Sequence, residues 1–194
     1  MSDGEQAPSA APAAEPAVLA RLRVRFPDAI VGTHAYRGDA TAEITPAALV
    51  DVCAFLRDDP GLRFDFLADV TAVDYLGSVP RFELVYHLRS IAQGHRVRVK
   101  TRVPEESPRV ASVTSVWRGA NWLERETYDM YGIVFEGHPD LRRIYLYEEF
   151  QGYPLRKDYP KEKRQPLVTV RDVAPEQGER TAAREQQRYG RWPD

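Results

Sequence analysis

The feature that most constrains this fold is a pair of neighbouring segments in which apolar and charged residues alternate. The first runs from Phe82 to Leu88, the second from Val97 to Val103, and a short loop containing Gly94 joins them. Alternation with a period of two is typical of strands that bury one face, and two such strands with a short connection form a β-hairpin. We therefore predict a hairpin whose apolar face lies in the core. Its polar face carries Arg81, Glu83, His87, Arg89, Arg96, Arg98, Lys100 and Arg102.

The segments around this hairpin carry helix and strand signals without a regular βαβ order. Thr45 and Pro46 are placed to begin one helix, and Gly132 is placed to end another. The predicted fold class is therefore α+β, a largely antiparallel sheet with helices packed on one face, followed by an extended C-terminal arm. Besides the hairpin, we expect strands at residues 30–36 and 64–74 and helices at residues 18–26, 46–59, 110–117 and 121–131.

Length and local composition divide the chain into one domain with two ends. A chain of 194 residues fits a single compact domain. Residues 1–16 are rich in Ala and Pro, which predicts a disordered leader, and residues 17–159 form the predicted α+β domain. Residues 160–194 carry 14 charges among 35 residues and cannot sustain a core, so we predict an extended arm that lies along another surface. The arm's apolar contacts would come from Leu167, Val168, Val170, Val173, Tyr189 and Trp192.

Composition excludes several kinds of protein. The single cysteine, Cys53, excludes an internal disulfide, an all-cysteine zinc site and a self-contained iron–sulfur cluster. It lies on the apolar stripe of its predicted helix, where we expect a small buried side chain rather than a reactive thiol. A net charge of −2 argues against dedicated nucleic-acid binding, and no stretch approaches the ~20 apolar residues that span a bilayer. Without a secretory signal pattern at its start, the chain is expected to be soluble and cytoplasmic.

One strand of the hairpin is strongly basic. Arg96, Arg98, Lys100 and Arg102 share a face, and residues 81–103 hold six Lys and Arg against one Glu. Such a stripe can attract nucleic acid or an acidic protein surface. It is also what a solvated strand face looks like, and the aromatic residues of the hairpin point to the core instead of forming stacking platforms. We favour the solvated face.

The densest group of chemically reactive residue types runs from residue 121 to residue 140. Glu124 and Glu126 are separated by roughly 200° around a helix axis, so they cannot form a paired-carboxylate site. Arg125 and Asp129 are spaced to form an ion pair, which would leave Asp129 poorly available to a metal. One histidine, His138, with scattered carboxylates is a weak metal signal. A free-standing enzyme that uses His138 with Glu126 or Asp129 is the minor alternative.

The same predicted helix has no face suited only to water. Leu123, Thr127 and Met130 lie on one side, and Trp122 lies with Arg125 on another. Trp, Tyr and Arg are the residue types enriched at interface hot spots. We therefore favour an interaction module, with this helix covered by its own core and by a protein partner.

From this helix onward the chain resembles the 30 kDa subunit, also called the C-type subunit, of proton-pumping NADH:quinone oxidoreductase, respiratory complex I. The resemblance rests on an ordered series of charged and aromatic identities and covers about residues 60–160. A looser likeness includes Phe66 to Val70 and Asp74-Tyr75. The matching residues are Glu124-Arg125-Glu126, Tyr128-Asp129, Tyr131-Gly132, Phe135, the run from Gly137 to Ile144, and the run from Pro154 to Tyr159.

The resemblance implies a non-catalytic structural subunit that binds no cofactor of its own. In the family, such a subunit packs against the 49 kDa-type subunit, and FMN and iron–sulfur clusters are held by partner subunits. The resemblance implies a place on the cytoplasmic side of the cell membrane, with only indirect membrane contact and no nucleic acid. Related membrane-bound hydrogenases and quinone- or phenazine-reducing complexes hold equivalent subunits and are the alternative context. The signature residues expected at the partner interface are Glu124, Arg125, Glu126, Tyr128, Asp129, Gly132, His138, Pro139, Arg142, Arg143, Pro154, Arg156, Lys157 and Asp158.

Overall fold

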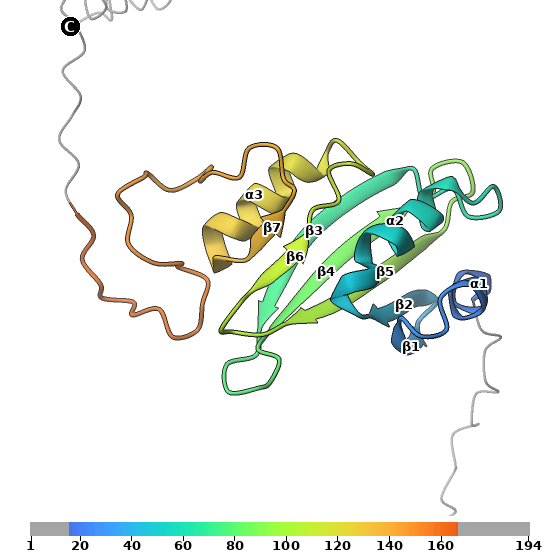
Figure 1. Cartoon of the computed structure of the whole chain (residues 1–194), viewed down its shortest axis with the longest axis horizontal. Helices are drawn as coiled ribbons and strands as arrows, with labels where there is room; N and C mark the ends of the chain where they lie inside the picture. The colour runs from blue at the N-terminus through green and yellow to red at the C-terminus, as the bar shows by residue number, and fades with distance from the viewer. Residues whose placement is uncertain (1–15, 167–194) are drawn as a thin grey trace, which may run out of the picture. The chain divides into compact units, whose positions relative to one another are not determined.

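The protein is described by a computed structural model that covers residues 16–166 (Figure 1). Residues 1–15 of the predicted leader, and the predicted arm beyond residue 166 with the apolar residues named for it, therefore lie outside the described residues. The elements, in chain order, are α1 (Ala17–Arg25), β1 (Ile30–Tyr36), β2 (Asp39–Ile44), the 3-10 turn η1 (Pro46–Ala48), α2 (Leu49–Asp58), β3 (Phe66–Asp74), β4 (Phe82–Arg89), β5 (Arg96–Val103), β6 (Arg109–Ala111), α3 (Ala120–Tyr131) and β7 (Val134–Glu136).

Five strands form the main sheet in the order β1-β2-β5-β4-β3. All neighbouring pairs are antiparallel except β2 and β5, which run parallel. The predicted hairpin is β4–β5, with Tyr86 opposite Val99 and Leu88 opposite Val97. The predicted α+β class, with a largely antiparallel sheet, is confirmed.

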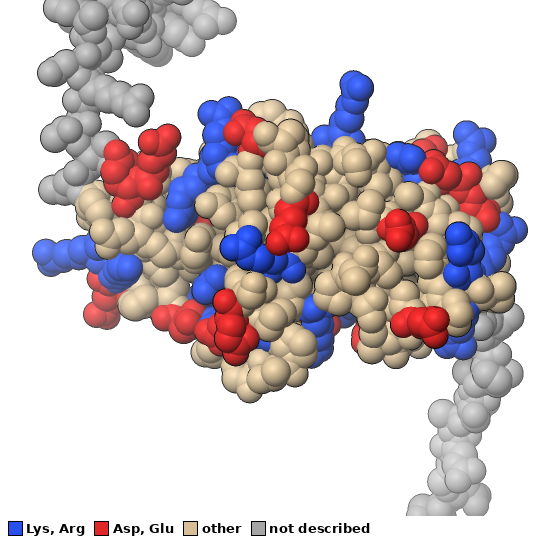
Figure 2. All heavy atoms as spheres, in the orientation of Figure 1, with Lys and Arg blue, Asp and Glu red and all other residues tan. Residues whose placement is uncertain are grey.

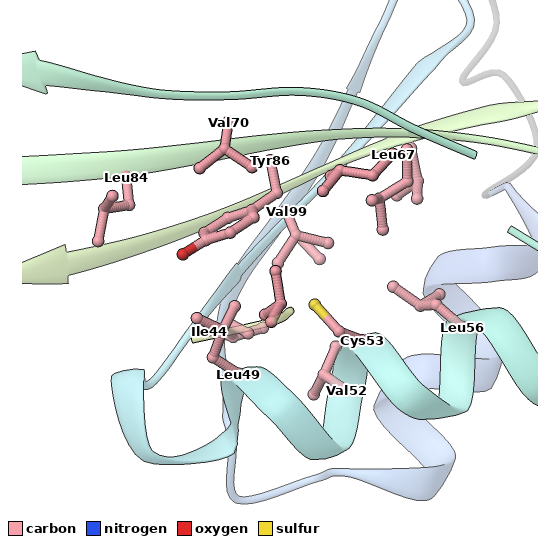
Figure 3. Close-up of a cluster of buried hydrophobic side chains, with 14 of the residues drawn as sticks. Ile44, Leu49, Val52, Cys53, Leu56, Leu67, Val70, Leu84, Tyr86 and Val99 are labelled. Carbon is pink, nitrogen blue, oxygen red and sulfur yellow. The ribbon is translucent and has the colours of Figure 1, made fainter. Parts of the chain in front are cut away.

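The core lies between one face of this sheet and the helices. Helix α2 crosses the sheet face in Figure 1 and contributes Leu49, Val52, Cys53 and Leu56, which are all fully buried. In Figure 3 the Cys53 sulfur points from α2 toward side chains of the sheet. Burial raises the pKa of the Cys53 thiol far above its ordinary value. The prediction of a small buried side chain at this position is confirmed.

The local structure differs from expectation at three places. Residues 110–117 do not form a helix, because Arg109–Ala111 is strand β6, paired in parallel with β7, and only one turn follows at Val113–Trp117. Val110, Val113 and Trp117 are all buried, so their helix-like spacing reflects a strand followed by a turn that enters the core. Strand β2, rich in Ala and Thr, was not foreseen. Thr45 occupies the N-cap position and Pro46 begins the helical segment as predicted, but the segment opens with the 3-10 turn η1 and the Thr45 side chain makes no cap hydrogen bond.

Strand β4 also departs from the predicted alternation. Glu83, expected on a solvated face, is only 2% exposed, and Arg81, which immediately precedes the strand, is 1% exposed. Glu83 accepts charge-assisted hydrogen bonds from Lys100 Nζ (2.8 Å) and Arg102 Nε (3.2 Å) on the adjacent strand. Because both cations fold over it, the carboxylate is shielded by its own partners.

Helix α3 packs beside β3, where the Thr127 hydroxyl lies 3.0 Å from the Val70 carbonyl oxygen. It ends as predicted at Gly132, which adopts the left-handed conformation at φ 74°. The ring of Tyr153 lies directly over Gly132, where a Cβ atom would overlap it. Glycine is therefore required at position 132 for two reasons, the positive φ angle and the close approach of the Tyr153 ring.

A long segment without helix or strand follows β7 and runs back along α3 (Figure 1). We call residues 137–163 the anchored loop. Connections of this length without regular structure are uncommon in compact domains. Polar contacts to α3 and to the end of the sheet hold the loop, and they are described in the next subsection.

The double requirement at Gly132 can be tested with a matched glycine. Gly77 also has a positive φ (87°), but nothing lies within 4 Å of the position its Cβ would take. We expect Gly77→Ala to cost about 1 kcal/mol of unfolding free energy, from backbone strain alone. Gly132→Ala should cost about 1–3 kcal/mol more, because the ring must also move. Urea denaturation measures both; equal losses would contradict the role given to Tyr153.

Candidate functional site

The anchored loop joins the rest of the chain at a buried arginine. Arg81 Nε and Nη2 donate to the two carboxylate oxygens of Asp74 at 2.8 and 2.7 Å. The same guanidinium donates to Glu105 at 2.6 Å and to both oxygens of Asp158 at 2.8 and 3.1 Å. Asp74 also accepts the backbone N–H of Lys157 at 2.8 Å. One buried cation therefore joins the β3–β4 connection, the segment after β5 and the anchored loop.

These contacts fix the protonation of the cluster. Hydrogen bonds from Arg81 hold the pKa of Asp74 and that of Asp158 below their ordinary values, and the three carboxylates raise the pKa of Arg81. A fork-shaped guanidinium meeting a carboxylate through two parallel bonds is among the strongest polar contacts in proteins. The contacts of Arg81 with Asp74 and Asp158 therefore favour the charged forms of these three groups, and the cluster is a structural joint.

A second anchor is the carboxylate of Asp129 on α3, which is fully buried. Its Oδ2 accepts three successive backbone N–H groups, from Ile144 (3.0 Å), Tyr145 (2.8 Å) and Leu146 (3.0 Å). Its Oδ1 accepts from Arg143 Nη1 at 2.8 Å. Burial alone would raise the pKa of Asp129, but these four donors outweigh it and hold the pKa below its ordinary value.

The predicted pair between Arg125 and Asp129 is wrong, because each has different partners. Arg125 Nε and Nη2 donate to the carbonyl oxygens of Arg142 and Arg143, both at 3.2 Å. Arg143 pairs with Asp129 instead, and its Nη2 also reaches the carbonyls of Phe150 and Gly152. The i, i+4 spacing allowed a pair within the helix. The backbone of the anchored loop supplies two carbonyl acceptors to Arg125 and three N–H donors to Asp129. These are more hydrogen bonds than the two side chains could make with each other.

The loop also completes the C-terminus of α3. Leu155 N–H donates to the Met130 carbonyl at 3.2 Å, and Arg156 Nε donates to the Tyr131 carbonyl at 2.6 Å. The last carbonyls of a helix have no partner within the helix, so such donors satisfy groups that would otherwise face water. The Arg156 guanidinium also lies 4.8 Å from the ring centroid of Tyr153. Loop and helix therefore stabilise each other.

Glu124 is a buried acid of a different kind. Its oxygens accept from Ser112 Oγ at 2.6 Å and Val113 N–H at 2.7 Å, and neither donor is charged. Burial raises its pKa to about 7, against the opposing effect of these two hydrogen bonds. Glu124 also raises the pKa of its neighbours Cys53 and Tyr86, secondary to their burial. It ties α3 to the turn that follows β6.

The residues of the predicted metal or acid–base site do not converge. His138 accepts the N–H of Asp140 through Nδ1, so its Nε2 carries the proton and donates to the Asn121 carbonyl at 3.2 Å. Glu126 is exposed and accepts from the Tyr145 hydroxyl at 3.4 Å. Within residues 16–166, no three His, Cys, Asp or Glu side chains are grouped to hold a metal ion.

The remaining signature residues lie on or beside the anchored loop. Tyr128 is half-buried, with its ring edge-on to Tyr153 at 6.5 Å. Arg142 is exposed and pairs with Asp140 at 2.9 Å, Pro139 is exposed, and Pro154 is half-buried. The structure brings eight signature residues into the anchoring contacts, namely Arg125, Asp129, Gly132, Arg142, Arg143, Arg156, Lys157 and Asp158.

Sequence reasoning missed Arg81, the central residue of the cluster. It placed Arg81 on the polar face of the hairpin, and no spacing rule links it to Asp158, 77 residues away. The available signal was weak: a carboxylate, Asp74, at the end of one strand and an arginine at the start of the next. The residue opposite Asp74 in the ladder is Phe82, so Arg81 reaches Asp74 from the neighbouring position.

The basic strand β5 is largely neutralised by neighbours. Arg96 pairs with Asp39, and Lys100 and Arg102 share Glu83. The ion pairs of β5 with Asp39 and Glu83 are what a solvated strand face shows, as the sequence analysis favoured. On the helix-bearing side of the molecule, which Figure 2 shows, Lys and Arg side chains are likewise interspersed with Asp and Glu.

A model of the family described as respiratory-chain NADH dehydrogenase, 30 kDa subunit, matches residues 42–165. The chain belongs to this family. The resemblance seen in the sequence is thereby confirmed, and the match includes the β4–β5 hairpin, both anchors and the anchored loop. Within residues 16–166, this family member has no helix that is long and apolar enough to cross a bilayer.

Relatives of the same family are similar over most of the chain. The C-type subunit of NADH-quinone oxidoreductase from Roseiflexus castenholzii is 54% identical over 145 residues, which cover 75% of this chain and 83% of the relative. A C-type subunit of the same enzyme from Rhizobium meliloti, numbered 2 in that organism, is 50% identical over 145 residues, covering 75% and 79%.

Two solved structures share the fold. The trypsin-resistant fragment (1–134) of Nqo5 superposes with a TM-score of 0.56 at 36% identity, covering 64% of this chain and 99% of the fragment. A chain of the membrane-bound sulfane sulfur reductase, an archaeal respiratory membrane complex, gives a TM-score of 0.65 and covers 91% of this chain and 94% of the other. At 21% identity, the second likeness shows the fold alone.

The Arg81 cluster can be tested by removing its cation. Arg81→Leu leaves the buried Asp74 carboxylate without its cation, with only the Lys157 N–H as donor, so we expect a loss of about 3–5 kcal/mol in unfolding free energy. Arg89→Leu is the matched control: it removes an exposed arginine of β4 and should change stability by at most about 0.5 kcal/mol. Urea denaturation distinguishes them, and similar small losses for both would contradict a structural joint at Arg81.

Glu124 predicts a dependence of stability on pH. Its pKa in the folded chain, about 7, exceeds the ordinary 4.5, so its contribution to stability is complete below about pH 4.5 and is lost as pH rises through 7. Glu124→Gln removes the charge; its amide oxygen can accept from the Val113 N–H, and its NH2 group can donate to Ser112 Oγ. Relative to the native chain, it should gain roughly 3 kcal/mol at pH 8 and little at pH 4.5.

Glu126→Gln, which replaces an exposed carboxylate of the same helix, is the control for Glu124 and should change the free energy of unfolding by at most about 0.5 kcal/mol. Unfolding free energies measured across this pH range decide the matter. A Glu124→Gln variant whose advantage is the same at both ends of the range would contradict a buried titrating acid.

Proposed function

We propose that this chain is a structural subunit in the peripheral arm of a proton-translocating NADH:quinone oxidoreductase, where it packs against the 49 kDa-type subunit. It binds no cofactor itself, and FMN and iron–sulfur clusters belong to its partner subunits. In this proposal the chain lies on the cytoplasmic side of the membrane and contacts the bilayer only through the complex. Family membership and the contacts of the signature residues support it.

The observation that carries the proposal is how Arg81 and the charged signature residues are used. Asp129 accepts four donors, Arg81 donates to three carboxylates, and Arg125 and Arg156 donate to backbone carbonyls. Groups saturated in this way inside the chain are poorly suited to bind a substrate or to transfer protons. They are well suited to hold a long loop in one shape, which is what a structural subunit needs in order to present a fixed surface to neighbours.

The cysteine of this chain is unsuited to hold a redox centre. The one cysteine is buried in the core with a strongly raised thiol pKa, and a thiol, unlike a thiolate, is a poor metal ligand. Electrons would therefore pass through neighbouring subunits. The role proposed here is to keep those neighbours in a fixed arrangement.

A second candidate is the equivalent subunit of a related respiratory membrane complex. The observation that favours it is the likeness in fold to a chain of the sulfane sulfur reductase, which extends over nearly the whole of this chain. Identification of the proteins that co-purify with this chain separates the two candidates.

The scaffold role predicts that breaking an anchor affects assembly rather than chemistry. Asp129→Asn keeps the size of the side chain but removes its charge. This weakens all four hydrogen bonds, because the amide oxygen is neutral and the NH2 group cannot accept. In cells that express the complete complex, we expect the variant to lower the amount of assembled complex several-fold. NADH:quinone turnover per assembled complex should remain within about twofold of the native value.

Native gels and quantification of each subunit measure assembly, and NADH oxidation normalised to flavin content measures turnover. Asp140→Asn, an exposed aspartate of the same loop, is the control and should leave both unchanged. A full set of subunits with a selectively slowed turnover would overturn the scaffold role and point to a direct part in catalysis.

A further inference from the structure

Two large exposed aromatic side chains accompany an acid on the outer side of α3. Trp122 is 62% exposed and Tyr145, from the anchored loop, is 66% exposed. Glu126 lies one helical turn after Trp122, and its Oε2 accepts from the Tyr145 hydroxyl at 3.4 Å. Helix and loop therefore form one surface here, which we call the Trp122–Glu126–Tyr145 patch.

The patch is held in place by the anchors described above. The Arg125 guanidinium lies 5.2 Å from the Trp122 ring centroid, and its N–H groups are bound to loop carbonyls. Tyr145 is held at its backbone, where its N–H donates to the buried carboxylate of Asp129 at 2.8 Å. Exposed aromatics that are already ordered lose little conformational entropy when a partner covers them. Such residues, Trp and Tyr above all, are typical interface hot spots.

The chemistry of the missing partner follows from Glu126. Its carboxylate is exposed, and within residues 16–166 it contacts the Tyr145 hydroxyl, with no cation paired to it. The nearest arginine in sequence, Arg125, is directed to carbonyl oxygens instead. A carboxylate flanked by aromatic rings is suited to a guanidinium, which can donate two parallel hydrogen bonds and stack on a ring face. Phosphate groups of a nucleic acid or lipid would be repelled.

We propose that the Trp122–Glu126–Tyr145 patch is a docking site for an arginine side chain presented by a neighbouring subunit of the complex. This inference rests on the proposed function, since it identifies the surface by which the chain is held. Trp122 and Tyr145 supply apolar contact and ring faces, and Glu126 supplies the charge. The anchors at Arg125 and Asp129 position the patch without touching the partner.

The test uses the complete complex, purified through an affinity tag on this chain. Trp122→Ala removes a ring face, and Glu126→Lys replaces the attractive charge by a repulsive one. For each, we expect at least about a tenfold drop in recovery of the partner subunits, as measured by quantitative mass spectrometry. Glu126→Gln, which keeps a hydrogen-bond acceptor but loses the charge, should fall between Glu126→Lys and the native chain.

Two matched controls lie elsewhere on the chain. Tyr36 is 68% exposed and also carries a stacked arginine, with the Arg37 guanidinium 5.3 Å from its ring centroid. Tyr36→Ala and Glu106→Lys, a charge reversal at another exposed acid, should keep recovery within about twofold of native. Because all four side chains are exposed, every purified variant chain should melt within a few degrees of the native one. A variant that melts far lower is replaced by Trp122→Gln or Glu126→Arg at the same position.

Placing the photoreactive residue p-benzoylphenylalanine at position 122 identifies the occupant. A cross-link to a partner segment that contains an arginine supports the proposal, and loss of that cross-link when the arginine is replaced by alanine completes it. If both Trp122→Ala and Glu126→Lys recover the partner subunits at the native level, this inference is overturned and the proposed function is unaffected. If even the native chain brings down no oxidoreductase subunits, the proposed function itself fails.

Discussion

The structure depends on a buried guanidinium that must be surrounded by carboxylates. Arg81 is almost fully shielded from water, and an isolated buried charge would cost several kcal/mol. Its three acidic partners come from three separate parts of the chain, the end of β3, the turn after β5 and the anchored loop. Satisfying one cation therefore fixes three loops at one end of the sheet. The apolar core alone could not do this, since hydrophobic contact is not directional.

The anchored loop shows how a segment without secondary structure can still have one conformation. Its backbone donors bind the Asp129 and Asp74 carboxylates and the Met130 carbonyl, so side chains and helix ends replace a strand ladder. Buried polar groups that are fully satisfied give geometric specificity at little net gain in stability. In the structural role proposed for this chain, specificity of shape matters more than added stability. Glu124 differs because its donors are neutral, which makes it a buried acid whose charge depends on pH near neutrality.

Much of the fold could be predicted because it depends on local patterns. The alternation in β4 and β5, the apolar stripe around Cys53 and the left-handed Gly132 all led to correct elements or positions. Failures occurred where local pattern and tertiary packing disagree. The spacing of Val110, Val113 and Trp117 suits a helix, but a strand and a turn bury the same side chains. The Ala- and Thr-rich β2 has little hydrophobic signal of its own and is defined by its neighbours β1 and β5.

The members of the site were predictable, but their connections were not. The family signature identified Asp129, Arg143 and Asp158 as members of the site. Their partners lie 14 to 77 residues away in the sequence, and no periodic pattern predicts contacts over such separations. The sequence therefore suggested a short-range pair, Arg125 with Asp129, where the fold uses two longer connections. The same long-range contacts explain why residues expected to face a partner mostly face their own chain. Buried anchors such as Arg125 and Asp129 set the position of Trp122 and Tyr145, and it is these outer side chains, with Glu126, that remain available for contact. A run of signature residues can thus serve an interface while most of its members never touch the partner.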